Sequence, residues 1–384
     1  MAGRILPSQR HLFDIPNDVA YLNCAYMSPL ATTVVEAVQK GAAAKARPWE
    51  LSPKDFFTDS EEVRGLVATL VNARADDVAF VPAVSYGMAV AAHALPLGPG
   101  RRVVTLAEQF PSNVYPWVEK ACAVNAIHTT VPRPSDDDWT AAVLEHIDDA
   151  TDVVAVPHCH WTDGGLLDLV AIRAACDRVG AALCIDATQS LGALPFDVKA
   201  IRPDFLCAAG YKWMMGPYSL GYLYVDPRWH GAAPIEHNWI ARVDSQNFSG
   251  LVDYKSDFQP GARRFDVGER SNFALMPGAK AALRLLLEWG VDNTATTLTT
   301  YTTRIAERAR VEFGLGSAPL AKRAGHFLGL RFDTGVPDGL LPALAARNVY
   351  VSVRGQSMRV TPHLYNTIED LDRLFACLNE WRAA

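Results

Sequence analysis

The chain has 384 residues, of which 49% are hydrophobic and 20% are charged, so it holds enough apolar material for a large core or for two domains. The formal net charge is −6, and its lysines and arginines are scattered rather than gathered in a basic stripe. This composition excludes the electrostatic footprint of a nucleic-acid-binding protein or of one held on an anionic membrane. We therefore expect small molecules or proteins as partners, with no nucleic acid and no membrane.

The N-terminal residues lack the apolar run of a signal peptide, and no segment approaches the roughly 18 apolar residues needed to span a bilayer. The seven cysteines are odd in number, widely spread and mostly inside apolar runs, with no C-x-x-C pair. Such cysteines are typical of reduced thiols in a protein core. The sequence predicts a cytoplasmic protein.

Short β-branched runs alternate with amphipathic runs of helix length between about residues 60 and 225. The predicted strands are 78–81, 102–106, 126–131, 153–157, 182–185, 205–208 and 221–225. The predicted helices are 61–71, 86–95, 113–123, 139–147 and 169–179. This alternation predicts an α/β fold with a mostly parallel sheet covered by helices. Catalytic and cofactor groups then belong at the carboxyl ends of the strands.

The rest of the chain has a different pattern. Residues 226–270 are rich in Pro, Gly, Asn and Ser and indicate a long irregular segment. Helices are predicted at 278–289, 297–313 and 368–381, and strands at 327–332 and 349–353, which together form a smaller C-terminal α+β domain. We expect residues 1–30 to join this small lobe, residues 31–255 to form the large cofactor-binding domain, and residues 256–384 to form the small domain.

One lysine, Lys212, stands in the otherwise uncharged stretch A-A-G-Y-K-W-M-M-G at 208–216. A buried lysine is costly unless it is paired, and its pKa falls readily, which suits it to Schiff-base chemistry. The ordinary alternative is that its stem packs while its charged head reaches water. Asp186 ends the apolar run 181–185 and could cap a turn or act as a fixed counter-ion. Both side chains can lie at the same edge of one sheet.

A pyridoxal phosphate (PLP) site needs such a pair, because a lysine forms the internal aldimine and an acid keeps the pyridine nitrogen protonated. The turn 84–88, V-S-Y-G-M, offers Ser85 and backbone amides at a helix N-terminus as a phosphate cradle. Phe110 can clamp the ring. Ser85 could also be a plain helix cap and Phe110 a core residue, but the order of all four features favours a PLP site.

Five motifs extend this pattern over nearly the whole chain: Y-L-N-C-A-Y at 21–26, F-P-S-N at 110–113, C-I-D-A-T-Q at 184–189, G-Y-K-W at 210–213, and R-V-T-P-H-L-Y-N-T-I-E-D at 359–370. With them the chain resembles the class V aminotransferase family of fold-type I PLP enzymes, the branch that contains cysteine desulfurases, kynureninase and isopenicillin N epimerase-like proteins. The resemblance implies PLP as cofactor, Lys212 as its Schiff-base lysine and Asp186 as the partner of the pyridine nitrogen.

The resemblance also implies further cofactor contacts. These are Gln189 near the phenolic oxygen, Phe110 on the ring, Ser85, the backbone amide of Tyr86 and Tyr211 at the phosphate, and His158 or His160 at the other edge of the cofactor. The two histidines could bind a metal ion, but no further ligand cluster supports one, and we expect no metal.

In this family the phosphate site borrows groups from a second subunit, so the resemblance implies a homodimer with shared active sites. Trp239 resembles such a contributor in kynureninase. Another contributor is expected after Gly268, where Glu269 would repel phosphate. Arg270, Ser271 or Asn272 remain candidates, and we select Asn272.

The resemblance assigns Arg359 to the α-carboxylate of an amino-acid substrate, which its planar fork suits. The structural alternative is a salt bridge between the lobes. Asn23 and Tyr26 of the first motif are further candidates for substrate binding.

A desulfurase would carry a persulfide-forming cysteine shortly before this arginine, and residues 351–358, V-S-V-R-G-Q-S-M, contain none. The resemblance then leaves Cα deprotonation of an external aldimine, followed by transamination, racemisation, β-elimination or side-chain cleavage. We favour an isopenicillin N epimerase-like enzyme, with a C–S lyase acting on a cysteine conjugate or a kynureninase-like enzyme as alternatives. From other classes we weigh a non-catalytic PLP-fold binding protein, and we exclude a nicotinamide dehydrogenase because residues 81–85 offer no G-x-G-x-x-G.

Overall fold

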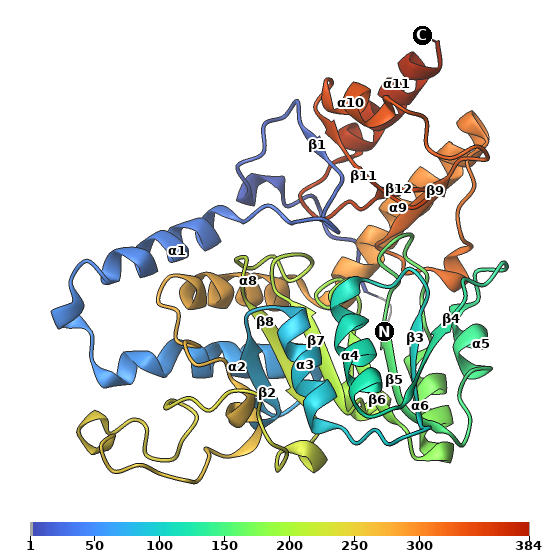
Figure 1. Cartoon of the computed structure of the whole chain (residues 1–384). Helices are drawn as coiled ribbons and strands as arrows, with labels where there is room; N and C mark the ends of the chain where they lie inside the picture. Colours follow the sequence, from blue (N-terminus) through green and yellow to red (C-terminus); the bar gives the residue numbers. More distant parts are fainter. Residues whose placement is uncertain (1–2, 384) are drawn as a thin grey trace.

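A seven-stranded sheet lies at the centre of the protein, in a computed structural model that describes residues 3–383 (Figure 1). Its strand order is β2-β8-β7-β6-β5-β3-β4. The strands are β2 (Val78–Val81), β3 (Arg102–Leu106), β4 (Ile127–Val131), β5 (Thr151–Pro157), β6 (Ala182–Asp186), β7 (Phe205–Ala209) and β8 (Gly221–Val225). Only β8 runs antiparallel to its neighbours, β2 and β7. The mostly parallel sheet predicted from the sequence is confirmed.

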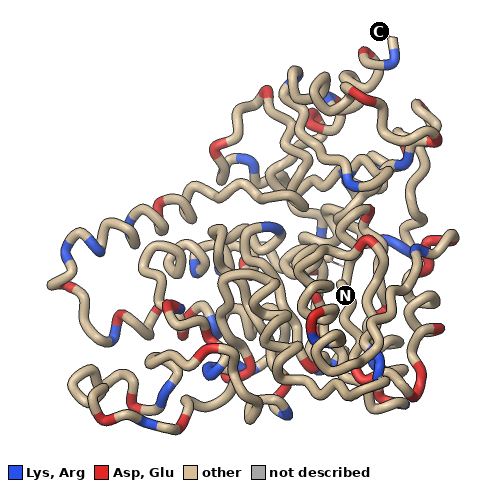
Figure 2. The backbone as a smooth tube through the Cα atoms, in the orientation of Figure 1, with Lys and Arg blue, Asp and Glu red and all other residues tan. Residues whose placement is uncertain are grey.

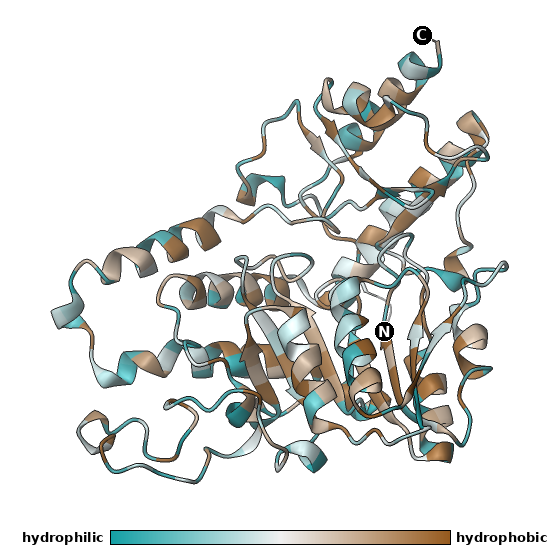
Figure 3. Ribbon diagram, viewed as in Figure 1, coloured by the Kyte–Doolittle hydropathy of each residue, from teal (hydrophilic) through white to brown (hydrophobic). Residues whose placement is uncertain are grey.

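Helices cover both faces of this sheet. The helices of this part of the chain are α1 (Thr32–Ala44), α2 (Thr58–Val71), α3 (Val84–Ala94), α4 (Tyr115–Ala123), α5 (Trp139–Leu144), α6 (Leu169–Val179), α7 (Val198–Ile201) and α8 (Leu275–Trp289). On β5, Val153 and Ala155 pack toward α3 and α4, whereas Val154 and Val156 join the core beneath α2, α6 and α8. The strands β2, β6, β7 and β8 are buried throughout and largely apolar, as their brown colour in Figure 3 shows, whereas the edge strand β4 is polar and partly exposed.

The C-terminal lobe contains a three-stranded antiparallel sheet in the order β11-β12-β9. Its elements are α9 (Val291–Phe313), β9 (Leu328–Arg331), α10 (Leu340–Ala345), β10 (Val349–Tyr350), β11 (Ser352–Arg354), β12 (Ser357–Val360) and α11 (Ile368–Ala383). The prediction of one strand over 349–353 is wrong, because β10 and β11 pair with different strands. A tight hairpin at Gly355, whose φ is +54°, connects β11 to β12.

The beginning of the chain lies against this lobe. β1 (Ala20–Tyr21) pairs in parallel with β10, and the backbone amide of Cys24 donates to the carbonyl of Thr361 at 3.0 Å. The helix α8 packs on α1 and α2, beside the large sheet. α1 connects these two regions, and neither it nor α10 was predicted from the sequence.

Positions of basic and acidic residues alternate along the backbone in Figure 2, with both signs spread over the molecule. Among residues 3–383, no helix combines the length and the apolar character that a membrane span requires. The long segment between β8 and α8 holds only short 3-10 turns, at Pro227–Trp229, Phe248–Gly250 and Gly261–Phe265, in keeping with the predicted irregular segment.

Candidate active site

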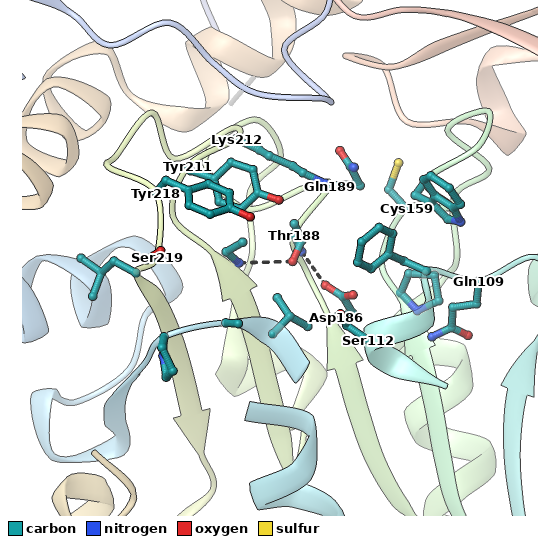
Figure 4. A pocket seen from close by; sticks show the side chains of 18 residues that line it. Gln109, Ser112, Cys159, Asp186, Thr188, Gln189, Tyr211, Lys212, Tyr218 and Ser219 are labelled. Carbon is teal, nitrogen blue, oxygen red and sulfur yellow. Dashed lines mark hydrogen bonds between the residues drawn. The ribbon is translucent and has the colours of Figure 1, made fainter. Parts of the chain in front are cut away.

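A cavity of about 360 Å³ opens where β5, β6 and β7 end (Figure 4). The register of the sheet aligns these ends, since Pro157 pairs with Asp186 and Asp186 pairs with Cys207. The side chains of chemical interest in its wall are Phe110, Trp161, Asp186, Gln189, Tyr211 and Lys212. The structure therefore brings the predicted lysine and the predicted acid into one pocket.

Lys212 follows β7 and is only 6% exposed. Its Nζ lies 5.3 Å from the centre of the Phe110 ring and 5.7 Å from that of Tyr211. Burial lowers the pKa of Lys212 to about 8; the charge of Asp186 opposes this shift, and Arg359 adds to it. No carboxylate within residues 3–383 lies within 4.0 Å of its Nζ, so the amine is not held in an ion pair. A buried amine with a lowered pKa is suited to nucleophilic and basic chemistry.

Asp186 is the last residue of β6 and is buried. The backbone amide of Thr188 donates to its carboxylate at 3.0 Å. Burial raises the pKa of the Asp186 carboxyl, while hydrogen bonds from Thr188 and the charge of Lys212 oppose the rise. A cationic group bound beside this carboxylate would keep it ionised, as a protonated pyridine nitrogen would.

Gln189 and Phe110 border the same cavity. The Gln189 side chain is fixed at both ends, because its Oε1 accepts from Trp213 Nε1 at 2.9 Å and its Nε2 donates to the carbonyl of Ala25 at 3.2 Å. The Phe110 ring packs edge-on against Trp161, with centroids 5.3 Å apart. A flat aromatic cofactor fits this donor set: a buried acid, a buried amine, an amide and an aromatic ring around one cavity.

Arg359 lies on β12, beside the cavity, and is 1% exposed. Its Nε donates to Ser352 Oγ at 3.0 Å and its Nη1 to the carbonyl of Trp161 at 2.9 Å. No carboxylate pairs with Arg359 in the part of the chain that the structure describes, so the alternative of an interlobe salt bridge is not realised. Burial and the nearby Arg354 lower the pKa of Arg359 to about 9, which leaves it charged at neutral pH. It is a cation available to an anionic ligand.

The substrate candidates near the N-terminus lie in different places. The side-chain oxygen of Asn23, Oδ1, accepts from the Ser352 hydroxyl at 2.9 Å, which connects Asn23 through Ser352 to Arg359. Tyr26 is largely exposed and borders a separate surface depression with Met27. In this chain Asn23 belongs to the arginine's hydrogen-bond network and Tyr26 does not line the cavity.

Several predicted cofactor contacts do not line the cavity. The Tyr86 hydroxyl donates to Glu236 at 2.7 Å, and Ser85 is exposed in the first turn of α3. Both residues follow Ala83 and Val84, which do line the cavity, so the amino end of α3 faces it. The Ser85 and Tyr86 side chains thus lie outside the cavity wall, whereas the backbone amide of Tyr86 lies in the first turn of α3, and its contact with the phosphate stays a prediction.

Neither histidine of 157–161 lies in the cavity wall formed by the described residues. His160 is buried, stacks on Trp139 at 4.7 Å, and bonds the Ala107 carbonyl at 3.1 Å and the Thr162 hydroxyl at 2.8 Å. The amide of His158 donates to the Asp186 carbonyl at 3.2 Å, and burial lowers the pKa of its ring to about 4. His158 is thus adjacent to the acid through the backbone, whereas His160 belongs to the core.

The candidates for contributions from a second subunit also lie away from the cavity of their own chain. Trp239 packs on Phe56 and Phe248, with centroids 6.2 and 5.5 Å apart. Asn272 accepts from the amides of Ala274 and Leu275 at the start of α8.

Several cavity residues are not predicted from the sequence, and Trp161 and Tyr218 are the large aromatic ones among them. Trp161 contacts Phe110 on one side, and the guanidinium carbons of Arg354 and Arg359 lie 5.6 and 5.8 Å from the centre of its indole ring. Tyr218 lines the cavity beside Tyr211. Trp161 follows the histidine pair directly and Arg354 lies in the stretch 351–358, where the sequence was searched only for a cysteine.

Comparison with known proteins gives consistent matches. The family described as Aminotransferase class-V matches residues 21–374. The uncharacterized aminotransferase YcbU of Bacillus subtilis (strain 168) is 30% identical over 386 residues, which cover 95% of both proteins. A kynureninase of Deinococcus radiodurans is 28% identical over 274 residues, covering 68% of this chain and 64% of the relative.

Solved structures share the fold. A lysine mutant of C-DES with glycine covalently linked to its PLP cofactor aligns with a TM-score of 0.86 at 19% identity, covering 96% of this chain and 98% of that one. The cysteine desulfurase CsdA of Escherichia coli aligns with a TM-score of 0.82 at 19% identity, covering 97% and 96%.

Proposed function

The chain belongs to the class V aminotransferase family and is a PLP-dependent enzyme of fold type I, and from this premise we propose that it acts on an amino acid by removing the proton from Cα. The family and the cofactor expected from the sequence motifs are thereby confirmed. Within the family, we place the enzyme in the isopenicillin N epimerase-like group.

One observation carries the proposal: Arg359 is buried, charged and without a carboxylate partner in residues 3–383, beside the pocket that holds Lys212. A buried, unpaired guanidinium is costly, and a ligand carboxylate would remove that cost through two parallel hydrogen bonds. The α-carboxylate of an amino acid supplies this group. Arg359 would therefore hold the substrate by its carboxylate and leave the rest of the molecule in the pocket.

The other residues of the pocket would hold the cofactor and accept the Cα proton. PLP, when bound, supplies an electron sink for negative charge that develops at Cα. Asp186 would keep a proton on the ring nitrogen, and Phe110 would pack on the ring. Lys212 would accept the Cα proton, because its lowered pKa provides free amine near neutral pH.

Desulfurase chemistry of the persulfide type is disfavoured by the hairpin between β11 and β12. Its connecting residues are Gly355 and Gln356, and no cysteine lies on either strand. The cavity does contain Cys159, but that thiol is buried at the end of β5, and burial raises its pKa well above the usual range. A protonated, immobile thiol is a poor carrier of sulfur.

The second candidate is β-elimination from a cysteine conjugate. The cavity is open to solvent beside the Phe110 ring, which lies in its wall and is 37% exposed. This opening would let the distal half of a conjugate extend into solvent while the amino-acid half reaches Lys212. Kynureninase-like side-chain cleavage shares the same first step and is distinguished by its product.

A single assay tests these alternatives. The purified enzyme is incubated with a panel of amino acids and cysteine conjugates in D₂O, and the products are identified by mass. We expect deuterium at Cα of the accepted substrate. A keto acid indicates transamination, pyruvate with a thiol indicates elimination, and alanine indicates side-chain cleavage. If no amino acid exchanged its Cα proton or was converted, the proposal would be abandoned.

We further propose that two copies of the chain form a homodimer with shared active sites. The connection between α1 and α2 and the segment 237–256 project on the same side of the molecule (Figure 1). Both carry strongly exposed apolar side chains, Trp49 on the first and Tyr254 on the second, the latter 95% exposed. Exposed apolar groups of this size are typical of interfaces. Light scattering after gel filtration should give twice the mass of 41.9 kDa, and a monomer mass at micromolar concentration contradicts the proposal.

A further inference from the structure

The turn that follows Lys212 has a strained backbone. Met215 and Ser219 have φ of +56° and +66°, values that non-glycine residues adopt at a cost, and they flank Gly216 and Pro217. The turn folds Tyr218 back onto Tyr211, with ring centroids 4.5 Å apart. Strain of this kind persists where the surrounding structure fixes a functional geometry.

The two phenol groups have no partner in the protein. Neither the Tyr211 nor the Tyr218 hydroxyl makes a hydrogen bond within residues 3–383, although other tyrosines, such as Tyr86, do. Figure 4 shows the two rings side by side with both hydroxyls pointing into the cavity. Burial raises the pKa of Tyr211, so its phenol stays protonated and can donate. Tyr218 is 60% exposed, so water also reaches its hydroxyl, and within residues 3–383 the two hydroxyls are donors without acceptors that face the same space.

The pairing of β2 with β8 brings the amino end of α3 near the two tyrosines. Val81 pairs with Gly221, so the residues just before Gly221, including Tyr218, lie beside residues 82–84 at the amino end of α3. That helix end carries unbonded backbone amides and attracts anions. The phenols and the helix amides thus share one corner of the cavity.

The wall of the cavity offers hydroxyl groups rather than cations for a phosphate. Among the described residues, the one cationic side chain in the wall is Lys212, which the aldehyde of the cofactor would engage, and the one anionic side chain is Asp186. Ala209 has no hydroxyl; the Thr188 hydroxyl accepts from the Ala209 amide at 3.2 Å and keeps its own proton to donate, and Ser112 and Ser219 also line the wall. Neutral donors from this chain must then supply the hydrogen bonds.

We propose that Tyr218 is a cofactor-binding residue whose hydroxyl, paired with that of Tyr211, donates a hydrogen bond to the phosphate group of PLP. The strained turn holds the two rings with their centroids 4.5 Å apart, in the same cavity wall as the amino end of α3. The inference concerns cofactor binding, which is measured without turnover, so it can fail while the proposed reaction stands.

The test compares PLP with pyridoxal, which lacks the phosphate group. The enzyme is stripped with hydroxylamine, and both compounds are titrated into wild type, Tyr218→Phe and Tyr211→Phe by absorbance. Phenylalanine keeps the ring contact and removes only the hydroxyl. Tyr115→Phe is the matched control, because Tyr115 is exposed on α4 and does not line the cavity.

We expect Tyr218→Phe to weaken PLP by about tenfold or more, as the loss of a hydrogen bond to a charged group does, and to leave pyridoxal binding unchanged. The ³¹P resonance of bound PLP should also shift in this variant. Equal weakening of PLP and pyridoxal would place Tyr218 at the ring and overturn the proposal. Unchanged binding of both would overturn it as well.

Discussion

Lys212 and Arg359 are both buried cations at one pocket, but different parts of the chain hold them. Lys212 follows a strand of the large sheet, whose backbone register places it beside Asp186. Arg359 lies on the small sheet and reaches the pocket through hydrogen bonds to Ser352 and to the backbone at Trp161. The cofactor side is thus fixed by continuous strand pairing and the substrate side by contacts between lobes. Substitutions on the first side should abolish the chemistry, and substitutions on the second should weaken substrate binding.

Replacing the lysine should have the largest effect. Lys212→Ala removes both the group that bonds the cofactor and the base, so we expect turnover to fall by at least about a thousandfold. Borohydride should no longer fix the cofactor to the protein, as mass spectrometry of the intact chain would show. Lys199→Ala, at an exposed lysine of α7, is the control. A Lys212→Ala enzyme that still fixes PLP would refute the assignment.

Replacing Arg359 should weaken substrate binding and leave cofactor binding intact. In Arg359→Gln the PLP absorbance should persist, while the concentration of amino acid that half-saturates its spectral change rises by about a hundredfold, the value of a charge-assisted pair. Arg347→Gln removes an exposed arginine that pairs with Glu380 and serves as control. Loss of the cofactor from Arg359→Gln would contradict the division between the two sides.

The sequence predicts the site residues best where they directly follow strands of the large sheet. Asp186 and Lys212 could be placed together because consecutive parallel strands end at one sheet edge, and the cavity lies there. His160 also follows a strand of this sheet, β5, and was therefore predicted at the cofactor. Its ring instead turns into the core and stacks on Trp139, a contact that no local pattern encodes.

Groups that come together through the packing of distant segments escaped the sequence analysis. The carbonyl of Trp161 meets Arg359 across 198 positions of the chain, and this contact defines the substrate side. The sequence predicts one strand at 349–353 because V-Y-V-S-V is a single run rich in β-branched residues, and only the separate partners of β10 and β11, which are β1 and β12, distinguish the two strands. Propensity specifies strand character, whereas tertiary contacts choose the partner.

The pH dependence of PLP uptake tests whether the pKa of Lys212 is lowered. Burial lowers its pKa to about 8, and only the neutral amine attacks the aldehyde. The stripped enzyme should therefore take up PLP at a rate that rises about tenfold per pH unit below pH 8 and levels off above it. Stopped-flow absorbance measures this profile. A rate that still rises toward pH 10 would mean that the amine is solvated.

Removing the hydrogen bond between Ser352 and Arg359 should have the smallest effect on substrate binding. The Ser352 hydroxyl accepts from Arg359 Nε and donates to Asn23, so Ser352→Ala leaves the guanidinium one bond short without changing its charge. We expect amino-acid binding to weaken by about threefold to tenfold, with PLP affinity unchanged. Ser357→Ala is the matched control, because this buried serine lies on the adjacent strand and its hydroxyl makes no hydrogen bond in residues 3–383. Ser352→Thr keeps the hydroxyl and should restore binding; if it binds no better than Ser352→Ala, packing rather than the hydrogen bond orients Arg359.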